Sequence, residues 1–318
     1  MADIKITDLT VGMEIKNELY ILWYNELKKA SNNKFYMDFQ FRDKTGEING
    51  KKWDATPNEL NDYNNAELYF VTGRVTEFQG SLQLNISSLR KAPQQIQKNI
   101  ADFVQSAPVS SDDMLNKVYE YINLIKDEEL NKLCTQVYQE NSEQIRFYPA
   151  AKALHHSVRG GYLYHITTML DLAKAISNVY TTVNTDFLYS GILLHDIMKL
   201  KEMNANECGI ADYSTEGQLM GHIEMGICYI GEMAKKIELS QNKELLLKHM
   251  ILSHHYIPEH GSTKMPMFLE AELLHHIDLI DARTYDFNKA YETLQKGEIT
   301  ERTVFSLDRK VMNPDFEK

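Results

Sequence analysis

The first ninety residues carry short runs in which apolar and polar positions alternate. Apolar residues occupy every second position of the clearest run, KFYMDFQFR (34–42). A period of two predicts a half-buried β-strand. The turn residues DKTG (43–46) and a second run at 47–53 predict the returning strand of a hairpin.

Three further strands and one short helix complete this part of the chain. The pattern predicts strands at 14–27, 68–78 and 82–86, with a tight turn at Gln79-Gly80. Between them, Thr56, Pro57 and Glu59 form the start of a short helix with a capping box. The order β-β-β-helix-β-β in under 100 residues is typical of an OB-fold, a five-stranded β-barrel that often binds single-stranded nucleic acid.

The period changes to that of helices near residue 111. Ser110 or Ser111 is a candidate cap before the acidic residues Asp112 and Asp113, and only helices are expected from there to about residue 290. The chain is therefore expected to combine an OB-fold barrel with an all-α helical bundle. We divide it into a barrel at 1–90, a linker with two prolines at 91–111, a helical domain at 112–296 and a polar tail at 297–318.

Composition agrees with two globular domains. The chain has 318 residues, of which 43% are hydrophobic and 25% charged, and these are the proportions of a protein with a sizeable core. No signal peptide and no membrane span are visible, so no membrane partner is expected. Three separated cysteines predict neither a disulfide framework nor a cysteine zinc site, and a cytoplasmic location is expected.

Charge and histidine are unevenly distributed along the chain. Residues 1–98 contain 13 basic and 13 acidic residues, whereas the remainder carries the whole net charge of −11. An acidic protein does not attract nucleic acid over its whole surface, although a local groove can still bind a single strand. All eleven histidines lie between His155 and His276, which indicates metal or proton chemistry in the second domain.

Two strings in the first domain resemble a known family. RDKTGEINGKKWDAT (42–56) and VTGRVTEFQGSLQLNISSLR (71–90) resemble the OB domains that precede an HD domain in YhaM-type 3′-5′ exoribonucleases. Outward aromatic residues would then stack on bases. The candidates for stacking are Tyr36, Tyr69 and Phe78, and Arg74, Lys51 and Lys52 are candidates for phosphate contacts. Phe39, Trp53 and Phe70 are assigned to the barrel core.

Five helical segments of the second domain carry the candidate chemistry. They are GGYLYHITTML (160–170), LLHDIMKL (193–200), GHIEMG (221–226), ILSHHY (251–256) and LLHHIDLIDAR (273–283). A helical bundle can direct imidazoles and carboxylates from different helices toward one metal site. This donor set suits manganese, iron or zinc, and two such ions can bind a phosphate and activate water. The candidate ligands are His165, His195, Asp196, His222, His254 and Asp278.

The order of these residues resembles the HD phosphohydrolase superfamily. That resemblance implies that His195 and Asp196 bind metal with His165 and Asp278, while His222 and His254 define a second ion. Asp196 would also be catalytic, Lys199 of the HDxxK pattern would meet the substrate phosphate, and His255 would be a ligand or a proton donor. Met198 replaces the glycine that is commoner before this lysine. The candidates for substrate contacts are His155, His156, Arg159 and Arg283, while Asp281 is expected to support a ligand or to lie on the helix surface.

The resemblance covers both domains and also includes GSTKMPMFLEAELLHHIDLIDAR (261–283). It implies a metal-dependent 3′-5′ exoribonuclease that hydrolyses single-stranded RNA to nucleoside 5′-monophosphates, with single-stranded DNA as a further substrate class. The cofactor would be two divalent ions, manganese first, with iron, cobalt and zinc as alternatives. An HD phosphohydrolase acting on nucleotides and a non-catalytic nucleic-acid-binding protein are the alternative functions. Self-association into a homo-oligomer is left open.

Overall fold

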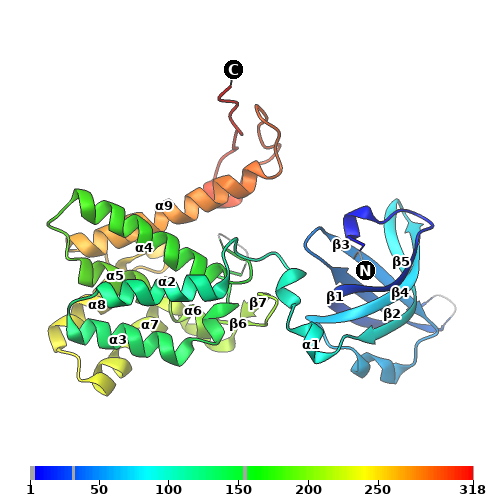
Figure 1. The fold of residues 1–318 in the computed structure, drawn as a ribbon, viewed down its shortest axis with the longest axis horizontal. Coiled ribbons are helices and arrows are strands. Elements are labelled where there is room, and N and C mark those ends of the chain that lie inside the picture. Colours follow the sequence, from blue (N-terminus) through cyan, green and yellow to red (C-terminus); the bar gives the residue numbers. More distant parts are fainter. Residues whose placement is uncertain (1–3, 31–32, 153–155, 318) are drawn as a thin grey trace. The chain divides into compact units, whose positions relative to one another are not determined.

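A computed structural model describes residues 4–30, 33–152 and 156–317 of the chain (Figure 1). The chain divides into two compact units. The first contains Met1–Ser106 with Asn206–Cys208, and the second contains Ala107–Ala205 with Gly209–Lys318. The first unit is built from strands and the second mainly from helices.

The first unit is a closed five-stranded barrel with the strand order β1-β2-β3-β5-β4. Antiparallel pairing joins β1 to both β2 and β4, and a short parallel pairing of β3 with β5 closes the ring. This arrangement confirms the expected OB-fold. The strands are β1 (Glu14–Lys29), β2 (Phe35–Arg42), β3 (Glu47–Trp53), β4 (Glu67–Phe78) and β5 (Ser81–Lys91).

The barrel core follows from the alternation of the strands. In β2, Met37, Phe39 and Phe41 are at most 1% exposed, as the period of two predicts. The register between β4 and β5 shifts at Gly73, where an added Cβ would lie 2.4 Å from the carbonyl oxygen of Asn85. Only glycine allows the two strands to approach this closely. The predicted capping box between Thr56 and Glu59 begins a short 3-10 helix, Pro57–Asp62.

The second unit is a bundle of helices around a continuous apolar core. Ser110 caps α2 by accepting a hydrogen bond from the Asp113 backbone, as predicted. Helix α9 packs against α4, α5 and α8, and in Figure 1 its C-terminal part extends beyond the other helices. The helices of this unit are α2 (Ser111–Leu124), α3 (Glu128–Asn141), α4 (Gly161–Val179), α5 (Thr185–Leu194), α6 (Lys199–Glu202), α7 (Thr215–Ile237), α8 (Gln241–Ser253) and α9 (Leu269–Tyr291).

Three local features differ from the sequence-based expectation. A two-stranded antiparallel sheet, β6 (Met203–Ala205) with β7 (Ala211–Tyr213), interrupts the region where only helices were expected. The segment expected to be a linker contains a one-turn helix, α1 (Gln94–Gln97). The polar tail forms isolated bridges, one of them between Ile299 and Met312.

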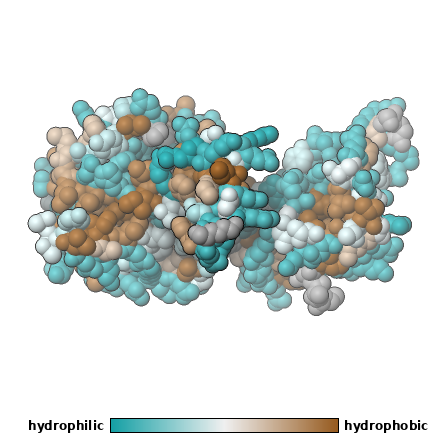
Figure 2. Space-filling view, turned by 90° about the horizontal axis from the view of Figure 1, so that it is seen from above, coloured by the Kyte–Doolittle hydropathy of each residue, from teal (hydrophilic) through white to brown (hydrophobic). Residues whose placement is uncertain are grey.

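Figure 2 shows the surface of one face of the molecule. In Figure 2 hydrophilic side chains cover much of the visible face, with a band of hydrophobic residues on the helical unit and a smaller patch on the barrel. Among the described residues, no helix has the length and hydrophobicity needed to cross a membrane.

Candidate active site

The predicted metal ligands converge from five helices of the second unit. His165 lies on α4 and His222 on α7, while Asp278 lies on α9. His195 is the C-terminal cap residue of α5, and His254 has the same place at the end of α8. Residues far apart in the sequence therefore meet at one place in the bundle, and most of them are almost fully buried.

Asp196 lies at the centre of this group. Its Oδ2 atom is 3.4 Å from Nε2 of His195 and 3.8 Å from Nε2 of His165. Its Oδ1 atom is 3.4 Å from Nε2 of His222 and 3.7 Å from Nε2 of His254. One carboxylate therefore has a histidine pair beside each of its oxygens.

Four histidines direct Nε2 toward Asp196, because Nδ1 of each ring contacts an oxygen on its other side. Nδ1 of His195 lies 2.9 Å from the carbonyl oxygen of Ile192, and Nδ1 of His254 lies 2.7 Å from that of Ile251. Nδ1 of His165 and of His222 each contact a carboxylate instead. A proton on Nδ1 leaves the Nε2 lone pair of each ring free to bind a ligand.

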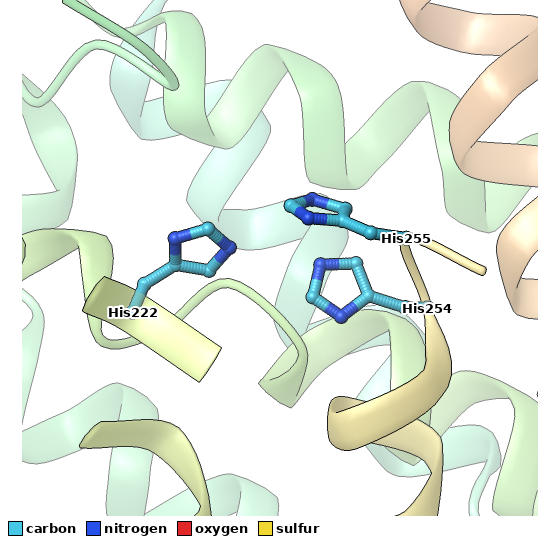
Figure 3. Close-up of side chains that lie close together, drawn as sticks. All are labelled: His222, His254 and His255. Carbon is cyan, nitrogen blue, oxygen red and sulfur yellow. The ribbon is translucent and has the colours of Figure 1, made fainter. Parts of the chain in front are cut away.

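The three imidazoles His222, His254 and His255 form one candidate ion site (Figure 3). A nitrogen from each ring lies within 4.8 Å of the others, and Figure 3 shows the rings grouped around a common space. Burial, followed by the nearby His222, lowers the pKa of His255 to about 4. Burial and the neighbouring His255 also hold the pKa of His254 well below its usual range. Both rings are therefore neutral at neutral pH, as metal binding requires.

A second candidate site contains two histidines and carboxylates. His165, His195 and Asp278 each offer an atom within 4.8 Å of the others, and Asp278 Oδ1 lies 3.4 Å from Nε2 of His165. His195, Asp196 and His254 form a further group with the same spacing. Asp196 can therefore contribute to both sites.

The buried ammonium group of Lys199 balances part of the negative charge of the site. Nζ of Lys199 lies 2.7 Å from Oδ2 of Asp196, one turn along the chain. Burial alone would raise the pKa of Asp196, but the positive charge of Lys199 and the contact with His195 outweigh it and hold the pKa well below its usual range. The central carboxylate is therefore ionised, which suits binding of a cation.

The donor set fits divalent metal ions. In the described part of the chain, the buried atoms without a hydrogen-bond partner include Nε2 of His195, His222 and His254, and Oδ1 of Asp196. Buried polar atoms are rarely left without partners unless a ligand or water satisfies them. Donor atoms that share an ion at about 2.1 Å lie roughly 3–4 Å apart, which is the spacing found here. Imidazoles and carboxylates without thiolates favour ions such as manganese, iron or zinc.

Two carboxylates at the site carry little or no signal in the sequence motifs. Oδ2 of Asp281 lies 2.7 Å from Nδ1 of His165 and 2.7 Å from Nε2 of His156. Glu202, which no motif singles out, accepts a hydrogen bond from the backbone of His222 and contacts its Nδ1, both at 3.0 Å. Asp281 is 7% exposed, so of its two expected places the helix surface is wrong.

The residues expected to contact substrate differ in their burial and in their distance along the chain from the predicted ligands. His156 is 1% exposed, contacts Asp281 behind His165 and borders a cavity of about 380 Å³ that Tyr285 also lines. Arg159 is half-buried just before α4, and Arg283 is half-buried on α9, five residues after Asp278. His155 lies outside the described residues.

The barrel gathers three aromatic rings around one lysine. Nζ of Lys51 lies 5.1 Å from the ring centre of Tyr36, 5.7 Å from that of Trp53 and 5.1 Å from that of Phe78. Trp53 is 48% exposed and Phe78 54% exposed, and the rings of Tyr36 and Trp53 are 5.0 Å apart. We call Tyr36, Lys51, Trp53 and Phe78 the barrel aromatic cluster. Flat exposed rings with a cation among them provide surfaces on which bases can stack.

Two aromatic predictions for the barrel are wrong. Tyr69 was expected to face outward, but it is 1% exposed in the barrel core and its hydroxyl accepts a hydrogen bond from Asn64. Alternation misassigned Tyr69 because its neighbour Leu68 is also buried. The Gln97 side chain covers Leu68 and binds both its backbone N–H and its carbonyl group. Trp53 was assigned to the core, but it shares the outward face of β3 with Lys51. Phe39 is buried as expected, and Arg74 is exposed on β4.

Comparison with known proteins agrees with this architecture. The HD domain family matches residues 162–283, which contain all the predicted metal ligands. The 3′-5′ exoribonuclease YhaM of Halalkalibacterium halodurans is 36% identical over 289 residues, which cover 90% of this chain and 89% of that protein. The chain belongs to the YhaM family. It is therefore a hydrolase with an HD domain.

Two solved structures each match under a third of this YhaM-family chain. The second OB-fold domain of replication protein A from Methanococcus maripaludis is 16% identical, with a TM-score of 0.23, and the match covers 29% of this chain and 95% of that one. The OB domain of a Thermoplasma acidophilum protein is 15% identical, with a TM-score of 0.23, over 29% of this chain and 86% of that one.

Proposed function

We propose that the helical unit removes nucleotides from the 3′ end of single-stranded RNA and releases nucleoside 5′-monophosphates with the help of two divalent ions. The observation that carries this proposal is the convergence of four unpartnered buried atoms on one space, Nε2 of three histidines and Oδ1 of Asp196. Polarity and the preference for RNA come from the name of the relative. Manganese is the first candidate ion, because the donors are imidazoles and carboxylates.

The ions, when bound, would neutralise the phosphate and lower the pKa of an attacking water. His165, His195, Asp196 and Asp278 would hold one ion, and Asp196 with His222, His254 and His255 would hold the other. The low pKa of His255, about 4, supports a role as ligand over a role as proton donor, because at neutral pH the ring is neutral and is not an imidazolium acid.

Lys199 would bind the substrate phosphate. Burial alone would lower the pKa of Lys199, but the negative charge of Asp196 outweighs it and raises the pKa, so the ammonium group stays charged. A buried ammonium group beside the predicted ion sites is well placed to contact a phosphate oxygen as negative charge develops in the transition state. Arg159 and Arg283 are the candidates for further phosphate contacts, because guanidinium groups match phosphate geometry.

The barrel would bind the same strand through the barrel aromatic cluster. Base stacking on exposed rings contributes about 1–3 kcal/mol per base and depends little on sequence. Lys51 would place a positive charge among these rings, in a stretch (residues 1–98) that has equal numbers of basic and acidic residues. Arg74, exposed on β4, is a further phosphate contact in this proposal. The boundaries at residues 90, 111 and 296, the cytoplasmic location and self-association stay predictions.

The decisive experiment uses metal-stripped full-length protein and single-stranded RNA labelled at its 5′ end. With added Mn²⁺ we expect a ladder that shortens from the unlabelled end, with no ladder in chelator or with the Asp196→Asn variant. The matched control is Asp212→Asn, which removes an exposed carboxylate on β7 and should leave the ladder unchanged. RNA that is bound but stays intact with every divalent ion would contradict the proposal and indicate a binding protein. Hydrolysis of mononucleotides alone would indicate a nucleotide phosphohydrolase.

A further inference from the structure

The four histidines around Asp196 are held in two different ways. His195 and His254 end helices, and each directs Nδ1 to a backbone carbonyl three residues earlier. His165 and His222 lie within helices, where backbone carbonyls are already used by the helix itself. Each of these two rings meets a buried or nearly buried carboxylate from another helix, Asp281 or Glu202. Because the two rings belong to different candidate ion sites, each carboxylate stands behind one site.

Both carboxylate oxygens of Asp281 contact neighbouring side chains. Its Oδ2 atom is shared by His165 and His156 at 2.7 Å each, and its Oδ1 atom accepts a hydrogen bond from the Thr168 hydroxyl. Burial alone would raise the pKa of Asp281, but the two histidines outweigh it and hold the pKa below its usual range. Asp281 follows Asp278 by one turn of α9, so one helix carries both a predicted ligand and the group that orients another.

Glu202 depends on a break in α7. Gly221, with φ of +74°, interrupts the helix immediately before His222. This backbone conformation favours glycine, and the break leaves the His222 backbone N–H to be bound by Oε1 of Glu202. The same oxygen lies 3.0 Å from Nδ1 of His222. One carboxylate oxygen at the end of α6 thus fixes both the backbone and the ring of His222.

We propose that Asp281 and Glu202 are positioning residues that act on separate ions, Asp281 through His165 and Glu202 through His222. A carboxylate behind a histidine fixes its tautomer and raises the basicity of the outer nitrogen. A metal site could also be read from the spacing of His156, His165 and Asp281. However, the two histidines contact Oδ2 of Asp281 at the length of hydrogen bonds. The inference rests on the proposed two-ion function and adds that each ion has its own supporting carboxylate.

The test measures Mn²⁺ binding to metal-stripped full-length protein, with free Mn²⁺ followed by electron paramagnetic resonance. Wild type should bind two ions. Asp281→Asn and Glu202→Gln keep the shape of each side chain and remove its charge, and each should weaken one ion about 10–100-fold while leaving the other unchanged. Glu272→Gln is the matched control, because it removes a carboxylate on α9 that contacts the exposed His276. This control should bind both ions as wild type does.

Ligand variants assign each effect to a site. In a His165→Ala background, which retains the three-imidazole site, Asp281→Asn should change nothing further and Glu202→Gln should weaken the remaining ion. In a His222→Ala background the two effects should be reversed. Circular dichroism checks that each variant is folded. Thr168→Val removes the hydroxyl that contacts Oδ1 of Asp281 and the backbone carbonyls of Tyr164 and His165, but it keeps the Asp281 carboxylate. It gives a milder test of the same site if Asp281→Asn does not fold.

The outcomes separate this inference from the function on which it rests. Fewer than two Mn²⁺ ions on wild type would contradict the two-ion proposal, and this inference with it. Two ions on wild type, with both unaffected by the carboxylate variants, would overturn this inference alone. The inference would also fail, with the two-ion proposal intact, if Asp281→Asn and Glu202→Gln weakened the same ion.

Discussion

Nζ of Lys199 lies 2.7 Å from Oδ2 of Asp196, and both side chains are almost fully buried. The two oxygens of Asp196 therefore have different neighbours. Oδ2 meets an ammonium group, while Oδ1 faces His222 and His254 without a hydrogen-bond partner. A fixed positive charge beside a predicted ion site competes with metal ions for the same carboxylate, and it attracts a phosphate that approaches those ions.

Replacement of Lys199 should separate substrate binding from metal binding. Lys199→Met keeps much of the side-chain length but removes the charge, so kcat/KM for RNA should fall at least about 10-fold while Mn²⁺ affinity does not fall. Steady-state kinetics and Mn²⁺ titration on the same preparations measure both quantities. Lys201→Met, on the exposed side of α6, is the control and should behave as wild type. Unchanged kcat/KM in Lys199→Met would contradict the assigned role.

The two histidines of α8 provide a second matched comparison. His254→Ala removes an inward nitrogen beside Asp196 and should abolish detectable RNA hydrolysis and weaken binding of one Mn²⁺ ion. His249→Ala, five residues earlier, removes a ring that accepts a hydrogen bond from the Met267 backbone, and it should retain turnover. Hydrolysis assays with metal-binding titrations test both variants. Equal losses in the two variants would show that disruption of α8, and not loss of a ligand, explains the effect.

The sequence predicted the candidate metal ligands better than the carboxylates that contact those ligands. His195-Asp196 and the separated His165, His222, His254 and Asp278 could be selected because each stands in an apolar helical segment. The structure brings these residues together around Asp196. Asp281 and Glu202 could not be ranked in the same way, because an acidic residue on a helix is usually a solvated one. Only the kink at Gly221 and the packing of α4 against α9 turn them toward histidines.

The barrel shows where alternation fails as a guide. Alternation and turn residues together predicted all five strands, and β2 alternates clearly because one of its faces packs in the barrel core. Alternation misassigned Tyr69 because a later segment covers the outer face of β4 at Leu68, so both faces are buried there. It also gave no reason to turn Trp53 outward, since the contact with Tyr36 depends on the register of β2 with β3.

The barrel aromatic cluster should contribute to RNA affinity. Trp53→Ala removes one exposed ring and should raise the Kd for a single-stranded oligonucleotide about 5–150-fold, the equivalent of roughly 1–3 kcal/mol of stacking. Cleavage of a dinucleotide, in which both bases flank the bond that is broken, should stay unchanged. Fluorescence anisotropy measures the first quantity and a dinucleotide assay the second. Tyr24→Ala, on an exposed ring that contacts Glu26 and lies outside the cluster, is the control. Equal affinity of Trp53→Ala and wild type would contradict this role.

Metal-free protein should lose stability as the pH falls from 7.5 to 5.5. Burial lowers the pKa of His255 from 6.5 to about 4 in the folded chain. Below pH 6.5 the unfolded chain therefore binds a proton that the folded chain does not, and the free energy of unfolding falls by up to about 1.4 kcal/mol per pH unit for one such histidine. Urea unfolding at the two pH values should show a smaller loss in His255→Gln than in wild type, while the exposed His276→Gln control keeps the full loss. Equal losses of stability in His255→Gln and wild type would contradict the neutral, buried state of His255.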